Sequence, residues 1–217
     1  NLGGVDTVLD MGAGITLASG FWHAFHQDGE AKPIVATMGD STFFHSGTTG
    51  LINAVYNDAR FVLVILDNGI TAMTGMQPAI TQGTRVDGRK GNAIALETIV
   101  KGCGVAYIQV VDPYNVDHTI AEIKKAHAWA LSPEGGIAVV ISRHPCVIGL
   151  RNQALPEIFE VEITDECDDC GLCHLRFECP AMVRNPEKKK TEINPVLCSG
   201  CGVCLQICPK DAVQTVS

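Results

Sequence analysis

The sequence lacks the features that mark several large classes of protein. Basic residues are scarce, since 16 lysines and arginines stand against 24 acidic residues, a formal net charge of −8. This balance excludes a generally cationic surface for nucleic acid or an anionic membrane. No apolar run approaches the roughly 20 residues that a membrane helix needs. The first residues carry no basic segment followed by an apolar one, so they do not form a signal peptide. An initiator methionine is also absent, and we expect the 217 residues to be a piece of a longer polypeptide.

The sequence does contain enough apolar residues for a folded core, and its cysteines are unevenly placed. Hydrophobic residues make up 46% of the chain and charged residues 18%, which excludes intrinsic disorder. Eight of the ten cysteines lie between Cys167 and Cys208, behind a long region that holds only Cys103 and Cys146. Such tight groups without an export signal are typical of metal ligation in a reducing cytoplasm, not of a secreted disulfide scaffold. We interpret Cys103 as a small buried hydrophobe and Cys146 as a structural residue, with a role as metal ligand as the alternative for Cys146.

The first 160 residues alternate apolar strands with helices. Strands are predicted at 33–38, 61–66, 106–111 and 136–142, and helices from residue 11 and at 46–59, 93–104 and 116–131. Strands that are apolar on both faces, separated by helices of ten or more residues, indicate βαβ units. Because such crossovers are right-handed, we predict an α/β domain at 1–160, a parallel sheet with helices on both faces. Residues 161–217 contain few aliphatic side chains, so we predict a small second domain that bound inorganic cores stabilise.

Two groups of cysteines define the second domain. The group that begins at Cys198 has the pattern C-x2-C-x2-C-x3-C-P, which matches the run that binds a [4Fe–4S] cluster. The group that begins at Cys167 differs, because five residues instead of three precede its last cysteine. In such a run three cysteines hold one cluster and the fourth reaches the partner cluster. The expected ligands are therefore Cys167, Cys170, Cys173 and Cys208 for cluster 1, and Cys198, Cys201, Cys204 and Cys179 for cluster 2. Two zinc sites are the alternative, but zinc usually takes separated C-x2-C pairs. The tail resembles the bacterial two-cluster ferredoxins, which implies one-electron transfer.

A second group of polar residues lies where the first two predicted strands end. Gly39, Asp40 and Ser41 end one strand, and Asn68 follows the next. Because the carboxyl ends of parallel strands share one edge of the sheet, Asp40 and Asn68 are expected to be neighbours. Their oxygens suit a hard divalent cation. Ser41 and Thr42 offer hydroxyl and N–H groups to a phosphate at the helix start. For either residue alone, a capping Asp or a turn Asn is the alternative.

Two segments beyond this edge supply further candidates. His45 lies just after the strand end and could hydrogen-bond a substrate carboxylate or move a proton near neutral pH. A packed or capping histidine is the alternative. Met73, with Thr74 and Gln77, belongs to the loop AMTGMQP and is a candidate for lining the pocket, although Met73 could equally serve packing.

Together, Asp40 and Asn68 resemble the thiamine-diphosphate signature, GDG followed by N, with serine here at the third position. The segments GDSTFFHSGTTGLINAVYN, VILDNGITAMTGMQP, VVDPYNV and VISRHPC, then the paired cysteine runs, resemble the large (alpha) subunit of the indolepyruvate ferredoxin oxidoreductases, within the 2-oxoacid:ferredoxin oxidoreductase family. The resemblance spans essentially the whole chain and corresponds to the carboxyl-terminal portion of that subunit. It implies thiamine diphosphate, Mg²⁺ and two [4Fe–4S] clusters as cofactors. For Mg²⁺, the resemblance implies Asp40, Asn68 and the Ile70 carbonyl as ligands. Near the diphosphate it implies Gly39, Ser41 and Thr42. It also implies Met11 as the residue that supports the bent shape of the cofactor.

The same resemblance implies a reaction and partners. The reaction is oxidative decarboxylation of an aryl 2-oxo acid with coenzyme A, which gives acyl-CoA and CO₂ and reduces ferredoxin. The implied partners are a smaller beta subunit in a hetero-oligomer and ferredoxin, with no nucleic acid and no membrane. The glutamate that activates the aminopyrimidine is expected in an amino-terminal region. Two alternatives remain: another 2-oxo acid, such as pyruvate or a branched-chain oxo acid, or an electron-transfer subunit with an inactive thiamine fold.

Overall fold

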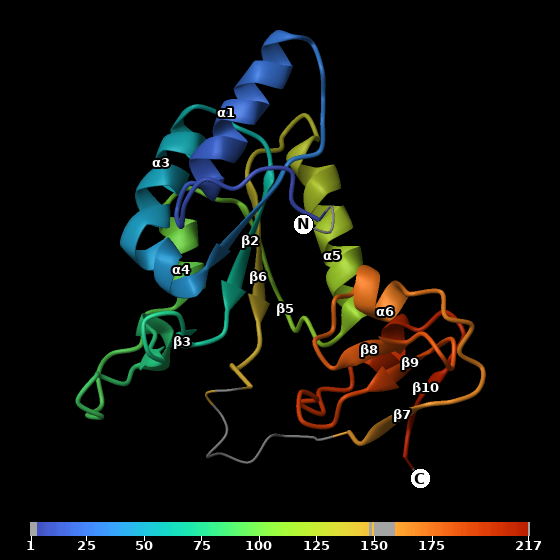
Figure 1. Cartoon of the computed structure of the whole chain (residues 1–217). Helices are drawn as coiled ribbons and strands as arrows, with labels where there is room; N and C mark the ends of the chain where they lie inside the picture. The colour runs from blue at the N-terminus through green and yellow to red at the C-terminus, as the bar shows by residue number, and fades with distance from the viewer. Residues whose placement is uncertain (1–3, 148, 150–158, 217) are drawn as a thin grey trace. The chain divides into compact units, whose positions relative to one another are not determined.

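The structure is a computed structural model that describes residues 4–147, 149 and 159–216 (Figure 1). The chain divides into two compact units, Thr7–Gly149 and a second unit that comprises Asn1–Asp6 and Leu150–Ser217. Among the described helices, none combines the length and the apolar character that crossing a bilayer requires.

The first unit contains a four-stranded parallel sheet with the order β1-β2-β6-β5. Its strands are β1 (Val35–Gly39), β2 (Val62–Asp67), β5 (Tyr107–Val111) and β6 (Ala138–Arg143). The two central strands, β2 and β6, are buried along almost their whole length. Their uninterrupted apolar sequences reflect this position, because both faces of a parallel sheet are covered. The four predicted strands are confirmed, with ends shifted by one or two residues.

Helices cover both faces of this sheet, as the sequence predicts (Figure 1). Their bounds are α1 (Gly14–Gln27), α3 (Thr48–Tyr56), α4 (Leu96–Gly102) and α5 (Val116–Ala130). The first three pack on one face, where Ile15, Leu51 and Val100 are fully buried against β2 and β6. On the other face, α5 buries Ala126 and Ala130. Removing a large aliphatic side chain from water contributes about 1.5–3 kcal/mol, so these contacts hold the sheet's edge in a fixed geometry.

The helix after β1 begins earlier than predicted. Instead of starting at residue 46, the chain becomes helical at once in α2 (Asp40–Thr42), continues as the π-helix η1 (Phe43–Gly47), and runs on into α3. A Cβ added to Gly47 would lie 2.5 Å from the Met38 sulfur, so glycine lets this wide turn pack on β1. Single π-turns inside helices are frequent at functional sites. The extra residue rotates the later side chains by about 100° around the helix axis, but α3 is too short for this shift in apolar periodicity to be recognised from the sequence.

The segment after β2 forms a small two-stranded sheet of its own. Its elements are β3 (Ile70–Thr71) and β4 (Gln77–Pro78), followed by the 3-10 helix η2 (Ile80–Gln82). This sheet carries the loop AMTGMQP at the carboxyl end of β2.

The second unit is built from short elements. They are β7 (Val161–Ile163), α6 (Leu172–Leu175), β8 (Met182–Asn185), β9 (Lys190–Ile193), α7 (Cys204–Ile207) and β10 (Val213–Thr215). Strands β7 and β10 pair antiparallel, as do β8 and β9. Among the described residues of this unit, Met182, Cys204 and Val213 form a cluster of buried hydrophobic residues, against which partly buried side chains such as Val161 and Ile193 pack. So small a core supplies little stability by itself, as expected for a domain that bound inorganic groups stabilise.

Candidate functional site

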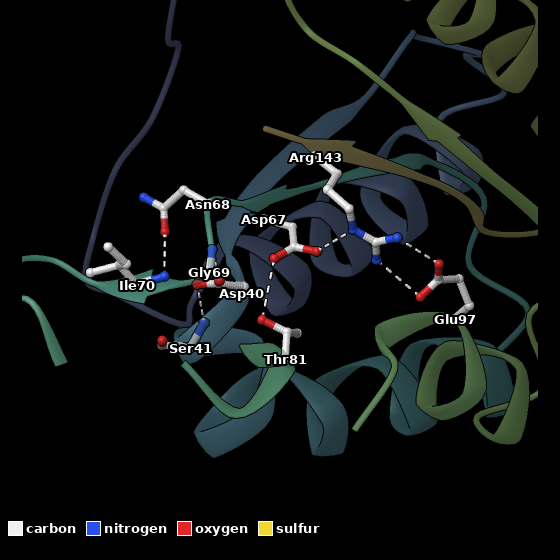
Figure 2. Close-up of polar contacts among 9 residues, drawn as sticks. All are labelled: Asp40, Ser41, Asp67, Asn68, Gly69, Ile70, Thr81, Glu97 and Arg143. Atoms are coloured by element: carbon white, nitrogen blue, oxygen red, sulfur yellow. Dashed lines mark hydrogen bonds and ion pairs between the residues drawn. The ribbon is translucent and has the colours of Figure 1, made fainter. Parts of the chain in front are cut away.

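The parallel register of β1 and β2 sets the geometry at the carboxyl edge of the sheet. Gly39 lies opposite Leu66, so Asp40 and Asp67 follow side by side at the ends of their strands. Asn68 and Gly69 follow directly after the end of β2 (Figure 2). The structure therefore brings together the two segments that the sequence predicts to be neighbours.

Asp40 is a buried carboxylate that both segments hold. Its side chain is inside the protein, with 3% of the residue exposed. One carboxylate oxygen accepts the Ser41 N–H at 2.6 Å, and the other accepts the Gly69 N–H at 3.0 Å. Burial raises the pKa of Asp40 above its ordinary value, although the two backbone N–H groups act in the opposite direction and nearby Asp67 adds to the rise. Among the described residues, no basic side chain pairs with Asp40.

A tight turn shapes the segment after β2. The Asn68 side-chain oxygen accepts the Ile70 N–H at 2.9 Å, an Asx turn (Figure 2). Gly69 has φ +72°, a conformation that favours glycine, and this turn aims its N–H at Asp40. The Ser41 and Thr71 hydroxyls lie 2.6 Å apart, which ties the start of the helical stretch to β3. Thr71 is a residue of this site that the sequence did not single out.

The sequence also missed an ion-pair network next to Asp40. Arg143, at the end of β6, donates from Nε to Asp67 at 2.6 Å and from its two other nitrogens to Glu97 at 2.9 and 3.0 Å. Figure 2 shows the guanidinium between the two carboxylates. Asp67 is 5% exposed, so Arg143 neutralises a second buried acid beside the first. The sequence does contain a signal for this pair, because Asp67 in VILDNGITAMTGMQP and Arg143 in VISRHPC each follow the end of a predicted strand.

The remaining predicted residues of this site lie around the same edge. Gly39 ends β1, and Thr42 is buried in the first turn of the helical stretch. His45 lies in the π-turn with its side chain exposed. Met11 and Met73 are also exposed, at 62% and 82%. The described contacts neither support nor oppose the roles predicted for the two methionines and His45.

The structure gathers the eight tail cysteines around two cavities. The first is lined by Cys167, Cys170, Cys173 and Cys208, and the second by Cys179, Cys198, Cys201 and Cys204. These are the two groups of four that the sequence predicts as ligand sets. Within the described residues, no three His, Cys, Asp or Glu side chains converge closely enough to hold a single metal ion. The longer interval before Cys179 is taken up by α6 and by a turn in which Glu178 has φ +57°.

The surroundings of the thiols differ between the two sets of cysteines. Burial raises the pKa of Cys204 to about 11, and neighbouring Cys201 adds to this because two thiolates repel each other. In the first set, the Cys173 sulfur lies 3.3 Å from the Thr191 hydroxyl, and the Cys208 sulfur accepts the Ala212 N–H at 3.3 Å. Bound iron would compensate the charge of thiolates that burial disfavours.

The two free cysteines of the first unit differ from the tail cysteines. Cys103 packs against the main hydrophobic core, and burial raises the pKa of its thiol. Its surroundings agree with the prediction of a small hydrophobe. Cys146 donates its backbone N–H to the Asn68 carbonyl at 3.1 Å, so its main chain supports the turn at the sheet edge.

Comparison with known families matches both units. Residues 5–142 match the family "Thiamine pyrophosphate enzyme, C-terminal TPP binding domain", and residues 191–214 match a 4Fe-4S binding domain. The first match covers more than half of the chain. The chain therefore belongs to the thiamine pyrophosphate enzymes and carries a ferredoxin-like 4Fe–4S domain behind the thiamine-binding fold.

Particular relatives narrow this class. The indolepyruvate oxidoreductase subunit IorA of Archaeoglobus fulgidus is 42% identical over 215 residues, which cover 98% of this chain and 33% of that protein. The subunit of the same name from Methanothermobacter marburgensis is 42% identical over 96% of this chain and 32% of its own length. The solved 2-oxoglutarate:ferredoxin oxidoreductase from Magnetococcus marinus is 19% identical over 62% of this chain and 45% of that one, with a TM-score of 0.49.

The two IorA relatives and the two family matches confirm the resemblance that the sequence motifs indicate. They also show that the chain spans about a third of the length of the curated relatives it matches.

Proposed function

We propose that the chain is the carboxyl-terminal portion of the alpha subunit of a 2-oxoacid:ferredoxin oxidoreductase of the indolepyruvate type. The reaction takes a 2-oxo acid and coenzyme A to acyl-CoA, CO₂ and a proton, and delivers two electrons to ferredoxin. The observation that carries this proposal is the presence on one chain of the buried Asp40 site and of two cavities lined by four cysteines each.

Asp40 is the feature of the first unit that best fits a cofactor site. It is a buried acid without a basic partner among the described residues, and its raised pKa reflects that uncompensated burial. A divalent cation would supply the missing positive charge, and carboxylate, amide and carbonyl oxygens are the ligands that Mg²⁺ takes. Asp40, Asn68 and the Ile70 carbonyl would hold Mg²⁺.

The residues at the start of the helical stretch would hold the diphosphate. Gly39, Ser41 and Thr42 offer N–H and hydroxyl groups where helix termini bind anions. When bound, thiamine diphosphate supplies the electron sink for decarboxylation of a 2-oxo acid. His45, exposed in the adjoining π-turn, would hydrogen-bond the substrate carboxylate or hold a proton. Met11 and Met73 would contact the cofactor from the two flanking loops.

In the second unit, each cavity would hold one [4Fe–4S] cluster. Cys167, Cys170, Cys173 and Cys208 would ligate cluster 1, and the other four cysteines would ligate cluster 2. Such clusters pass electrons singly, which suits a ferredoxin acceptor. A smaller beta subunit completes the proposed hetero-oligomer.

The test uses the full-length subunit, purified without oxygen together with its partner subunit. We expect viologen reduction only when a 2-oxo acid, coenzyme A, Mg²⁺ and thiamine diphosphate are all present. The variant Asp40→Ala should lose thiamine diphosphate binding and turnover but keep its iron. A matched control, Asp28→Ala, removes an exposed aspartate that follows α1 and should behave as wild type.

Two results would contradict the proposal. Full turnover by Asp40→Ala would favour an electron-transfer subunit with an inactive thiamine fold. A higher kcat/KM for pyruvate or branched-chain oxo acids than for indolepyruvate would overturn the aryl specificity, which rests on the names of the relatives and on the resemblance of the motifs.

A further inference from the structure

Thr191 is a buried polar residue in the wall of the first cysteine cavity. It lies in β9, with 2% of the residue exposed, and its backbone is fixed opposite Arg184 in the β8–β9 ladder. Its hydroxyl lies 3.3 Å from the sulfur of Cys173. A buried hydroxyl requires a partner, and here that partner is one of the four sulfurs around the cavity.

The direction of this hydrogen bond depends on whether Cys173 binds iron. Between a thiol and a hydroxyl, either atom can donate. A cysteine that ligates a metal is a thiolate without a proton, so the hydroxyl of Thr191 is then the donor. Hydrogen bonds to the ligand sulfurs are among the factors that set the reduction potential of an iron–sulfur cluster. A donated hydrogen bond stabilises the more negative, reduced state and raises that potential.

The contact distinguishes the two cavities. Thr191 lines the first and is not among the residues that line the second. The Ala212 N–H also donates to a sulfur of the first set, that of Cys208. The hydroxyl is the contribution that mutation can remove, because the Ala212 donor is main chain.

We propose that Thr191 tunes electron transfer by raising the reduction potential of cluster 1 relative to that of cluster 2. This inference rests on the proposed function, since it requires that Cys173 ligates a cluster. Thr191 is a positioning residue here, because it acts through Cys173 and touches neither substrate nor thiamine diphosphate.

The experiment compares Thr191→Val, which keeps the shape and removes the donor, with Thr191→Ser, which keeps the donor. The control Thr215→Val changes an exposed threonine of β10 that lines neither cavity. The full-length subunit is purified anaerobically, its iron is measured, and the two clusters are titrated with reductant and followed by electron paramagnetic resonance. In the valine variant we expect the reduction potential of cluster 1 to fall by about 59 mV, which favours its oxidised state roughly tenfold for a one-electron couple. The second cluster and the serine and control variants should keep wild-type potentials.

Each other outcome counts against a defined claim. Unchanged potentials in an iron-replete valine variant, or an equal shift of both clusters, would overturn the tuning role. If the valine variant takes up no iron, Thr191→Ala is titrated instead. If neither of these variants takes up iron while Thr191→Ser does, Thr191 has a structural role and the tuning role is overturned. Wild-type protein that takes up no iron at all would refute the proposed clusters themselves.

Discussion

Arg143 allows the electrostatics of the sheet edge to be tested by a change in stability. It bridges two acids of unequal burial, since the side chain of Asp67 is 4% exposed and that of Glu97 is 37% exposed. Removing one partner of a buried pair typically destabilises by about 3–5 kcal/mol, because the other charge stays behind without a counter-charge. Arg143 itself is 40% exposed, so solvent screens part of this effect, and we expect about 2 kcal/mol for Arg143→Met. The variant Glu97→Gln removes only the outer contact and should lose less than about 1 kcal/mol.

Urea unfolding followed by tryptophan fluorescence measures both variants. The two tryptophans of the chain, Trp22 and Trp129, lie in α1 and α5, so the signal reports on the first unit. The double variant Asp67→Asn/Arg143→Met should recover most of the loss, because it removes the stranded charge along with its partner. The importance assigned to the buried ion pair would be refuted if Arg143→Met were no less stable than Glu97→Gln. It would also be refuted if the double variant were no more stable than Arg143→Met.

Three further predictions concern pH, iron and ligand identity. The Arg143 hydrogen bonds lower the pKa of Glu97 below its ordinary 4.5. The contribution of Glu97 to stability is therefore present above that pH and is lost as the pH falls through the lowered pKa. The variant Glu97→Gln should flatten the dependence of the urea midpoint on pH in that acid range. Chelating the iron should make the second unit sensitive to protease, because its own hydrophobic core is small. The tryptophan fluorescence should still report a folded first unit. The variant Cys170→Ser should lose about four of roughly eight irons, whereas Cys103→Ser, outside both cavities, should lose none.

The sequence predicts the sheet well because its signals are local. Strands such as 61–66 are apolar without interruption, and a polar residue follows where each strand meets the open edge. Asp40 and Asn68 are therefore predictable as neighbours, since parallel strands bring their carboxyl ends together. The π-turn at Phe43–Gly47 is not predictable in this way, because the shift that one additional residue causes in the apolar periodicity cannot be recognised over so few residues.

Contacts between distant segments account for most of what the sequence did not reveal. Arg143 and Asp67 are 76 positions apart, and their pairing follows from the register of β2 and β6, which is a property of the folded sheet. The hydrogen bond between Ser41 and Thr71 likewise depends on how β3 turns back over the edge. Fixed motifs are different, because three cysteines at two-residue intervals specify their own grouping.

The contrast between the two buried aspartates argues that this edge is shaped for a cation. Asp67 has Arg143 as a counter-charge, whereas Asp40, one strand away and similarly buried, has two backbone N–H donors and the Asp67 carboxyl as partners and no basic side chain among the described residues. If packing alone had determined this edge, a neutral residue at position 40 would avoid the desolvation that raises the pKa of Asp40. Natural folds retain such local conflicts mainly at functional sites. Mg²⁺ held with thiamine diphosphate would resolve this conflict, so titration with Mg²⁺ and thiamine diphosphate together should raise the urea midpoint of the wild type and leave that of Asp40→Ala unchanged.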